Sequence, residues 1–265
     1  MLGFQLFLHS LRMILGNLAA AIRITIPILV FFAVLTAASL ILVGSPTATM
    51  QWASDMEAGR MVAPPAGFWV LFPFALIGGA ITFLWVATAW HRFILLEEVP
   101  GAMGPRFNGA AIGRYFAAGF VLGLLIFVVA FAMMFIGGMV GGIVASMGLG
   151  AWGFGIVMGL IAFIPILIAF YRLSPILPSA AVGPRITVGE AWSATSGSNG
   201  AMLMLALISF LASYAITWPL GLLAATAAPV AIVFQVIVQW ITTMYGISIM
   251  TTIYGHFVEK RDLNA

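Results

Sequence analysis

Six long apolar stretches, joined by short polar segments, take up most of this chain of 265 residues. They cover about residues 24–43, 68–95, 115–147, 154–173, 200–223 and 230–258. Each is long enough for a helix that crosses a bilayer, which needs about 20 apolar residues. Hydrophobic residues make up 63% of the chain and charged residues only 6%, and a soluble fold of this size could not cover so much apolar surface. The sequence therefore predicts an all-α fold: one polytopic membrane helix bundle over residues 1–265, with six transmembrane helices and no soluble domain.

The basic residues predict how this bundle is oriented. With six spans and a cytoplasmic N-terminus, nine basic residues fall on the cytoplasmic side: Arg12, Arg23, Arg92, Arg106, Arg114, Arg172, Arg185, Lys260 and Arg261. Only Arg60, in the polar segment at residues 44–67, falls on the other side. One span more or fewer would scatter this positive-inside pattern. We therefore expect a multi-pass membrane protein with both termini in the cytoplasm, and an N-terminal segment that is retained and not cleaved as a signal peptide.

The ends of the second and fourth apolar stretches resemble each other. AWHRFILLEEVPGAMGPRFNGAAI aligns with AFYRLSPILPSAAVGPRITVGEAW, so Arg92 matches Arg172, and the Gly-Pro-Arg turn at residues 104–106 matches the one at residues 183–185. A short amphipathic segment precedes each odd-numbered span, at residues 2–20, 107–114 and 187–199. These patterns predict interfacial helices and three repeated helix-hairpin units, at residues 1–100, 101–180 and 181–265. Chance similarity between apolar segments is the alternative.

The third of these short segments carries the clearest local signals. Thr187 precedes Glu190 by three residues, the spacing of a capping box, in which each side chain satisfies a free N–H group at a helix start. Trp192 has an amphipathic ring suited to the membrane interface, and Gly197 to Asn199 should end the helix. We expect this helix to lie along the cytoplasmic surface.

His91, Arg92, Glu97 and Glu98 form the densest polar cluster in the chain. The two carboxylates could bind a cation or act with His91 as an acid–base pair. Alternatively, the cluster is a helix end that emerges into water, where arginines meet helix-end carbonyls and lipid phosphates. The second interpretation is favoured, because the chain has no cysteine, no short metal-ligand spacing and no known catalytic motif. We therefore predict no catalytic residue, no metal and no cofactor.

Polar side chains also lie inside the sixth stretch. Gln235, Gln239 and Thr242 are followed by Ser248, Thr251 and Thr252. Polar groups inside a bilayer need protein or water as partners, so this stripe should face the bundle. It could line the path of a transporter or a lipid-handling permease, or it could join helices by hydrogen bonds. No aspartate, glutamate or lysine lies deep in a span, which argues against an ion-coupled transporter or a proton pump. Pro165 should kink the fourth span in either case.

The segment YRLSPILPSAAVGPRITVGEAWSATSGSN gives the chain a resemblance to known proteins. It resembles the membrane domain attached to some glycerophosphodiester phosphodiesterases, and the YciC-like inner-membrane proteins. The shared features are an arginine that closes a span, a proline, and a short helix with a tryptophan and a Thr/Ser-Gly ending, carried by Arg172, Pro178, Glu190, Trp192, Thr195 and Gly197. The phosphodiesterase catalytic domain has no counterpart in this chain. The resemblance implies an all-helical module of the bacterial inner membrane with a role in organising the envelope or a membrane complex.

Together these features favour a non-enzymatic scaffold or accessory subunit. The short helices and basic residues on its cytoplasmic side would contact anionic lipid headgroups or a membrane protein complex. The residues expected to make these contacts are Arg92, Arg106, Arg114, Arg172, Arg185 and Trp192. The partners would be membrane lipids, together with another membrane protein or further copies of the chain. Nucleic acid is not expected, because the basic residues are scattered at helix ends and form no phosphate-binding face.

Overall fold

This computed structural model describes residues 1–45, 47–183 and 185–263, without the side chains of residues 224, 225, 228, 229 and 232. Throughout these residues the fold is all-helical. The α-helices are α1 (Leu2–Leu15), α2 (Leu18–Val43), α3 (Ala48–Glu57), α4 (Phe68–Leu96), α5 (Gly109–Val144), α6 (Gly150–Met158), α7 (Ile164–Leu173), α8 (Ile176–Val182), α9 (Val188–Ala194), α10 (Asn199–Thr217), α11 (Pro219–Thr226) and α12 (Ala228–Phe257). The segment η1 (Ala145–Leu149) precedes α6 and contains a kink at Gly148, and a π-helical turn, η2 (Gly159–Phe163), follows α6. The proline of the predicted turn at residues 183–185 lies outside the described residues.

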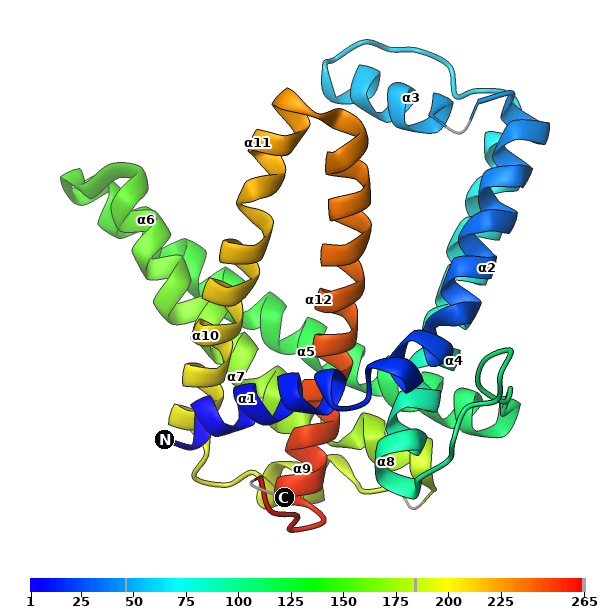
Figure 1. The fold of residues 1–265 in the computed structure, drawn as a ribbon. Coiled ribbons are helices and arrows are strands. Elements are labelled where there is room, and N and C mark those ends of the chain that lie inside the picture. The colour runs from blue at the N-terminus through cyan, green and yellow to red at the C-terminus, as the bar shows by residue number, and fades with distance from the viewer. Residues whose placement is uncertain (46, 184, 264–265) are drawn as a thin grey trace.

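Five stretches of the described chain are long and apolar enough to cross a membrane. They are Leu18–Val43, Phe68–Leu96, Gly109–Val182, Asn199–Leu223 and Val233–Phe257. The chain is therefore suited to a multi-pass membrane protein, as its sequence predicts. The stretch Gly109–Val182 contains both the third and the fourth predicted spans, because the chain reverses at Gly148 and α6 packs back against α5 (Figure 1). Gly148 has a φ of +100°, which glycine adopts without the strain that a Cβ would bring.

The long helices of the described chain form three hairpins (Figure 1). They pair α2 with α4, α5 with α6 and α7, and α10 and α11 with α12. The hairpins meet at the end of the molecule where both termini lie, and they spread apart at the other end. We call the end with both termini the terminal face, and it also contains α1, α8 and α9.

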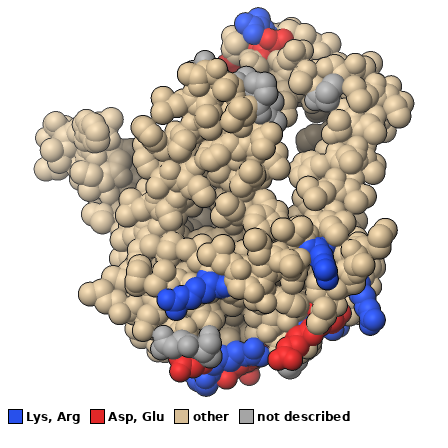
Figure 2. All heavy atoms as spheres, in the orientation of Figure 1, with Lys and Arg blue, Asp and Glu red and all other residues tan. Residues whose placement is uncertain are grey.

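Charge and apolar surface divide along the hairpins. Figure 2 shows charged side chains toward the terminal face and at the opposite end around α3, with an uncharged surface between them. Many large apolar side chains are exposed on this surface, among them Phe32, Phe127, Phe131 and Phe210. Such a surface fits lipid as the surrounding solvent. The hydrophobic core instead lies near the terminal face, where Leu6, Trp90, Met202 and Ile247 are fully or almost fully buried.

α1 packs against protein along its apolar side. Its buried residues are Gly3, Leu6, Ser10 and Ile14, and the helix lies across α10 and α12 (Figure 1). A Cβ on Gly3 would lie 2.5 Å from the carbonyl oxygen of Ala201, so glycine permits this close approach. Ser10 donates a hydrogen bond of 2.9 Å to Thr252. The amphipathic helix predicted at residues 2–20 is thus present but shorter, because the chain breaks between α1 and α2.

The other two predicted interfacial helices differ from each other. No separate helix occupies residues 107–114, and that prediction is wrong: Asn108 caps α5, accepting a hydrogen bond of 3.0 Å from the Ala111 N–H, and α5 then runs without a break. α9 forms with the predicted capping box. Thr187 Oγ1 accepts from the Glu190 N–H at 3.2 Å, and Glu190 Oε2 accepts from the Thr187 N–H at 2.6 Å. The hydrogen bond from the Thr187 N–H to the Glu190 carboxylate lowers the pKa of Glu190.

α8 is a short helix that the sequence did not lead us to expect. It contains proline, which disrupts a helix in most positions. Pro175 is the N-cap and Pro178 lies in the first turn, and the N–H groups at these positions have no partner within a helix, so proline removes nothing there. Residues 172–181 are all buried, and α8 packs against α4 and α5. In the fourth predicted span, Pro165 is the second residue of α7, and the π-helical turn η2 just before α7 interrupts the regular helix.

Candidate functional site

Arg172, which we expected to contact lipid or a partner, lies inside the protein near the end of α7. Only 7% of the residue is exposed. Its guanidinium donates hydrogen bonds to Thr195 Oγ1 at 3.3 Å, to Asn199 Oδ1 at 3.1 Å and to the Trp192 carbonyl at 2.7 Å. The Trp192 ring covers it, with the guanidinium carbon 3.5 Å from the ring centroid, while 44% of Trp192 remains exposed. Arg172 therefore holds α9 and the start of α10 against α7, and Trp192 presents its outer surface.

Two other predicted contact residues bind the end of α8. Arg92 donates to the Ala181 carbonyl at 3.0 Å, and Arg114 donates to the Ala180 carbonyl at 3.2 Å. The last carbonyls of a helix have no partner within the helix and carry partial negative charge. A guanidinium from a neighbouring helix satisfies both needs. These two arginines therefore join α4 and α5 to α8.

The basic residues after α12 act in the same way. Arg261 donates to the carbonyls of Ile94 and Leu95 at the end of α4, at 3.4 and 3.0 Å. Lys260 donates to the Phe257 carbonyl at the end of α12, at 2.7 Å. Of the nine basic residues predicted on the cytoplasmic side, five thus satisfy helix-end carbonyls, namely Arg92, Arg114, Arg172, Lys260 and Arg261. We call these five the capping residues.

The remaining four basic residues of that set are exposed. They are Arg12, Arg23, Arg106 and Arg185. None of their side chains makes a hydrogen bond or an ion pair with another described residue. Arg106 and Arg185 belong to the two copies of the predicted Gly-Pro-Arg turn. We call these four the free arginines, because the N–H groups of their guanidinium groups remain available to donate hydrogen bonds to a ligand.

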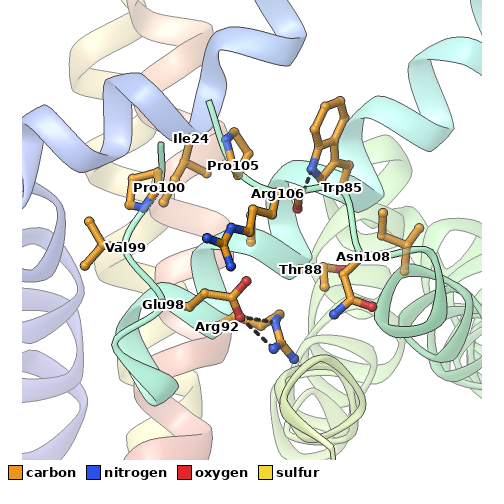
Figure 3. A pocket seen from close by; sticks show the side chains of 12 residues that line it. Ile24, Trp85, Thr88, Arg92, Glu98, Val99, Pro100, Pro105, Arg106 and Asn108 are labelled. Carbon is orange, nitrogen blue, oxygen red and sulfur yellow. Dashed lines mark hydrogen bonds and ion pairs between the residues drawn. The ribbon is translucent and has the colours of Figure 1, made fainter. Parts of the chain in front are cut away.

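Arg92 and Arg106 meet at a narrow pocket between the end of α4 and the loop that leads to α5 (Figure 3). Arg92 forms an ion pair with Glu98 at 2.6 Å, and the Arg106 guanidinium is turned toward this pair. Trp85 fixes the loop by donating to the Arg106 carbonyl at 3.2 Å. Thr88 also lines the pocket, 2% exposed, and its hydroxyl has no hydrogen-bond partner among the described residues. The pocket has a volume of about 10 Å³, which admits one water-sized group and not a headgroup.

His91 is separated from the glutamates with which we had grouped it. It is fully buried, with Nδ1 2.8 Å from Thr251 Oγ1 and Nε2 3.3 Å from the Tyr115 hydroxyl. Glu98 is bound to arginine, and Glu97 is exposed at the end of α4. Among the described residues, no three His, Asp or Glu side chains gather where they could hold a metal. The arrangement around His91 joins α4 to α5 and α12.

The predicted polar stripe of α12 divides into two parts. In the part near the terminal face, Thr251 bonds to His91, Thr252 accepts from Ser10, and Ser248 accepts from Trp90 Nε1 at 3.0 Å. These hydrogen bonds join helices. The partners on α1, α4 and α5 were missed, although a serine on the apolar side of α1 is a sequence signal that could have indicated Ser10.

The other part of the stripe does not face the bundle as we had expected. Gln235, Gln239 and Thr242 are exposed. Gln239 bonds only to Thr243 on its own helix, at 3.4 Å, and the Thr242 hydroxyl donates to the Val238 carbonyl at 2.7 Å. Trp240, in the same part of α12, donates a hydrogen bond of 3.0 Å to Thr25 Oγ1 on α2. Beyond this contact, toward α11, Figure 1 shows α12 standing apart from the hairpin of α2 and α4. The amide groups of both glutamines thus keep most of their hydrogen-bonding capacity.

A scan against models of known protein families gave no match, and searches of curated proteins and of solved structures gave none either. The resemblance to the YciC-like proteins and to the phosphodiesterase membrane domain therefore stays a prediction from the segment around Arg172.

Proposed function

We propose that this chain is a non-enzymatic scaffold or accessory subunit of the bacterial inner membrane, with six spans, and that its terminal face binds anionic lipid headgroups. The reversal at Gly148 supports the six-span count, because α5 and the segment from α6 to α7 run as two arms of a hairpin. An even number of spans leaves both termini on one side. The terminal face would then be cytoplasmic, in the anionic headgroup region.

The free arginines are the observation that carries this proposal. The capping residues donate to helix-end carbonyls of the protein. Arg12, Arg23, Arg106 and Arg185 are exposed, and their side chains make no hydrogen bond with another described residue. Trp192 adds an exposed aromatic ring, as expected of a residue at the headgroup level. An arginine near an anionic membrane surface contributes about 1 kcal/mol of binding free energy. The four together would therefore contribute about 4 kcal/mol at low ionic strength, and salt would weaken this.

Lipid binding by purified protein tests this proposal. Native mass spectrometry should show more phosphatidylglycerol than phosphatidylcholine retained by the wild type. A variant with Arg12→Gln, Arg23→Gln, Arg106→Gln and Arg185→Gln should lose this preference. Arg60→Gln, at the opposite end near α3, is the matched control and should keep it. An equal preference in the quadruple variant would contradict the proposal.

The orientation can be tested separately, because the chain has no cysteine. Ser54→Cys in α3 and Ser196→Cys after α9 each introduce a single exposed thiol at opposite ends of the molecule. A thiol reagent that cannot cross membranes should label the first variant in spheroplasts, and the second only after the membrane is permeabilised. The reverse pattern would place the terminal face outside the cytoplasm.

An accessory subunit should also have protein partners in the membrane. Chains that organise a membrane complex should remain attached to it in mild detergent. Purification with a tag, followed by identification of the bound proteins, tests this. A protein that elutes only as a solitary monomer under such conditions would leave lipid binding as the whole of the function.

The repeat of three hairpin units remains part of the proposal. In both copies of the Gly-Pro-Arg turn the glycine has positive φ, +119° at Gly104 and +141° at Gly183. The arginine ahead of each turn, Arg92 or Arg172, donates to a helix-end carbonyl. These common features support units two and three more than unit one.

A lipid-handling permease is the second candidate, and the exposure of Gln235 and Gln239 favours it. Polar side chains at this depth would line a watery path if one exists between α12 and the hairpin of α2 and α4. In a Gln239→Cys variant, a charged thiol reagent should label such a path and should not label a lipid-facing helix. Absence of labelling, with Ser54→Cys labelled in parallel, would reject the permease.

A further inference from the structure

A cavity at the terminal face brings together three segments that are far apart in the sequence. It lies between the end of α1, the end of α4 and the chain after α12, and its volume is about 420 Å³. Polar lining comes from His9, Arg12, Asn17 and Glu97, and apolar lining comes from residues such as Phe93 and Leu263. Ligand sites of small molecules start at about 300 Å³, so this cavity admits a group as large as a phospholipid headgroup.

The cavity has one charge of each sign, and the two charges do not neutralise each other. Arg12 on α1 and Glu97 after α4 are both exposed. Neither side chain makes an ion pair or a hydrogen bond with another described residue, although both line the same space. By contrast, the adjacent Glu98 is bound to Arg92. Arg12 can therefore donate hydrogen bonds to a bound molecule, and Glu97 can accept hydrogen bonds from it.

The surroundings of these charges are held in place by other contacts. The His9 ring bonds to the Leu263 carbonyl, with Nδ1 2.9 Å from the oxygen, and Leu263 is buried. Asn17 donates to the Met13 carbonyl at 2.9 Å. The His9 bond thus joins α1 to the C-terminal segment, and the Asn17 bond fixes the end of α1, so Arg12 lies on a wall held at both of these points.

The backbone at Glu97 is a second, independent observation. Glu97 has a φ of +58°, a left-handed conformation that glycine or asparagine usually fills at a helix end. A side chain with Cβ is strained there, and such strain often accompanies function. This backbone conformation places the Glu97 carboxylate at the cavity, although glycine would adopt the same conformation with less strain.

We propose that this cavity binds the phosphoethanolamine headgroup of a membrane lipid, with the phosphate at Arg12 and the primary ammonium at Glu97. A guanidinium pairs well with phosphate oxygens, and a carboxylate accepts hydrogen bonds from an ammonium group. Leu15 and Leu18 are exposed on either side of Asn17, which provides apolar surface for the acyl chains. The inference requires that the terminal face lies at headgroup depth, but it does not require the scaffold role.

Binding of short-chain lipids to the full-length protein in detergent tests this inference. Dihexanoyl phosphatidylethanolamine should bind at least tenfold more tightly than the phosphatidylcholine analogue, because a quaternary choline nitrogen cannot donate hydrogen bonds to Glu97. Glu97→Gln should abolish this preference and leave the affinity for phosphatidylglycerol unchanged. Arg12→Gln should weaken all phospholipids, and Glu57→Gln, on α3 at the opposite end, should change none of them.

Each outcome has a defined meaning. A wild type without preference for phosphatidylethanolamine, or a Glu97→Gln variant that keeps it, overturns the inference. Equal affinity for free glycerophosphoethanolamine would identify a soluble ligand and overturn the lipid headgroup. An unchanged melting temperature without lipid shows that Glu97→Gln is folded. Anionic lipid binding by the free arginines is tested by the quadruple arginine variant, and phosphoethanolamine binding is tested by Glu97→Gln. Failure of one proposal can therefore be distinguished from failure of the other.

Discussion

Replacing Arg172 by alanine should destabilise the fold because this guanidinium holds three helices together. It donates hydrogen bonds to Thr195, Asn199 and Trp192 and stacks on the Trp192 ring. Each hydrogen bond contributes about 1 kcal/mol of net stability, and the stacked cation–π contact contributes about another 1 kcal/mol. The expected loss is therefore about 4 kcal/mol.

The assay is equilibrium unfolding of the purified protein in mixed micelles, followed by tryptophan fluorescence. Arg172→Lys keeps the charge but cannot match the planar guanidinium at three acceptors and a ring, so it should lose about half as much stability. Arg185→Ala is the matched control, because it removes an exposed arginine without a partner, and its effect should stay within about 0.5 kcal/mol. If Arg172→Ala and Arg185→Ala had the same effect, the account of Arg172 as a structural clamp would be refuted.

Three further predictions concern backbone geometry and pH. Gly3→Ala places a Cβ against the α10 backbone and should cost roughly 1–3 kcal/mol of unfolding free energy, whereas Gly113→Ala, which meets no atom within 4 Å, should gain about 1 kcal/mol. Glu97→Gly should raise stability by about 1 kcal/mol in unfolding experiments, because it relieves the left-handed strain; a loss of stability would contradict this. The pKa of Glu190 is lowered by the capping box, so its contribution is present above the ordinary glutamate pKa of about 4.3 and is lost as pH falls through the lower folded value. The melting-temperature difference between wild type and Glu190→Gln should therefore change only in that acidic range, and a change between pH 6 and 8 would oppose the assignment.

The membrane character and the α9 cap could be predicted because their signals are local. Apolar stretches of span length and the Thr187–Glu190 spacing specify structure without reference to the rest of the chain. α8 could not be predicted in this way. Pro175 and Pro178 break a helix in most positions, and only their place at a helix start makes them compatible with one.

The roles of the arginines depend on tertiary structure. Arg172 closes the fourth predicted span and Arg185 lies in the polar segment after it, and both look like cytoplasmic arginines in the sequence. The structure buries the first and exposes the second, because α9 and α10 fold back over the end of α7 and supply its acceptors. Likewise, nothing near Glu97 in the sequence indicates that α1 and the chain after α12 will form a cavity around it.

The contact of Arg261 with the end of α4 has a consequence for the order of assembly. The carbonyls of Ile94 and Leu95 belong to the first hairpin, yet the guanidinium that satisfies them lies beyond the last helix. During synthesis, the first hairpin must therefore wait, with this end open, until residue 261 has left the ribosome. Insertion of the early spans and closure of the terminal face are therefore separate events in time. In a chain that stops before Arg261, the carbonyls of Ile94 and Leu95 would lack this donor.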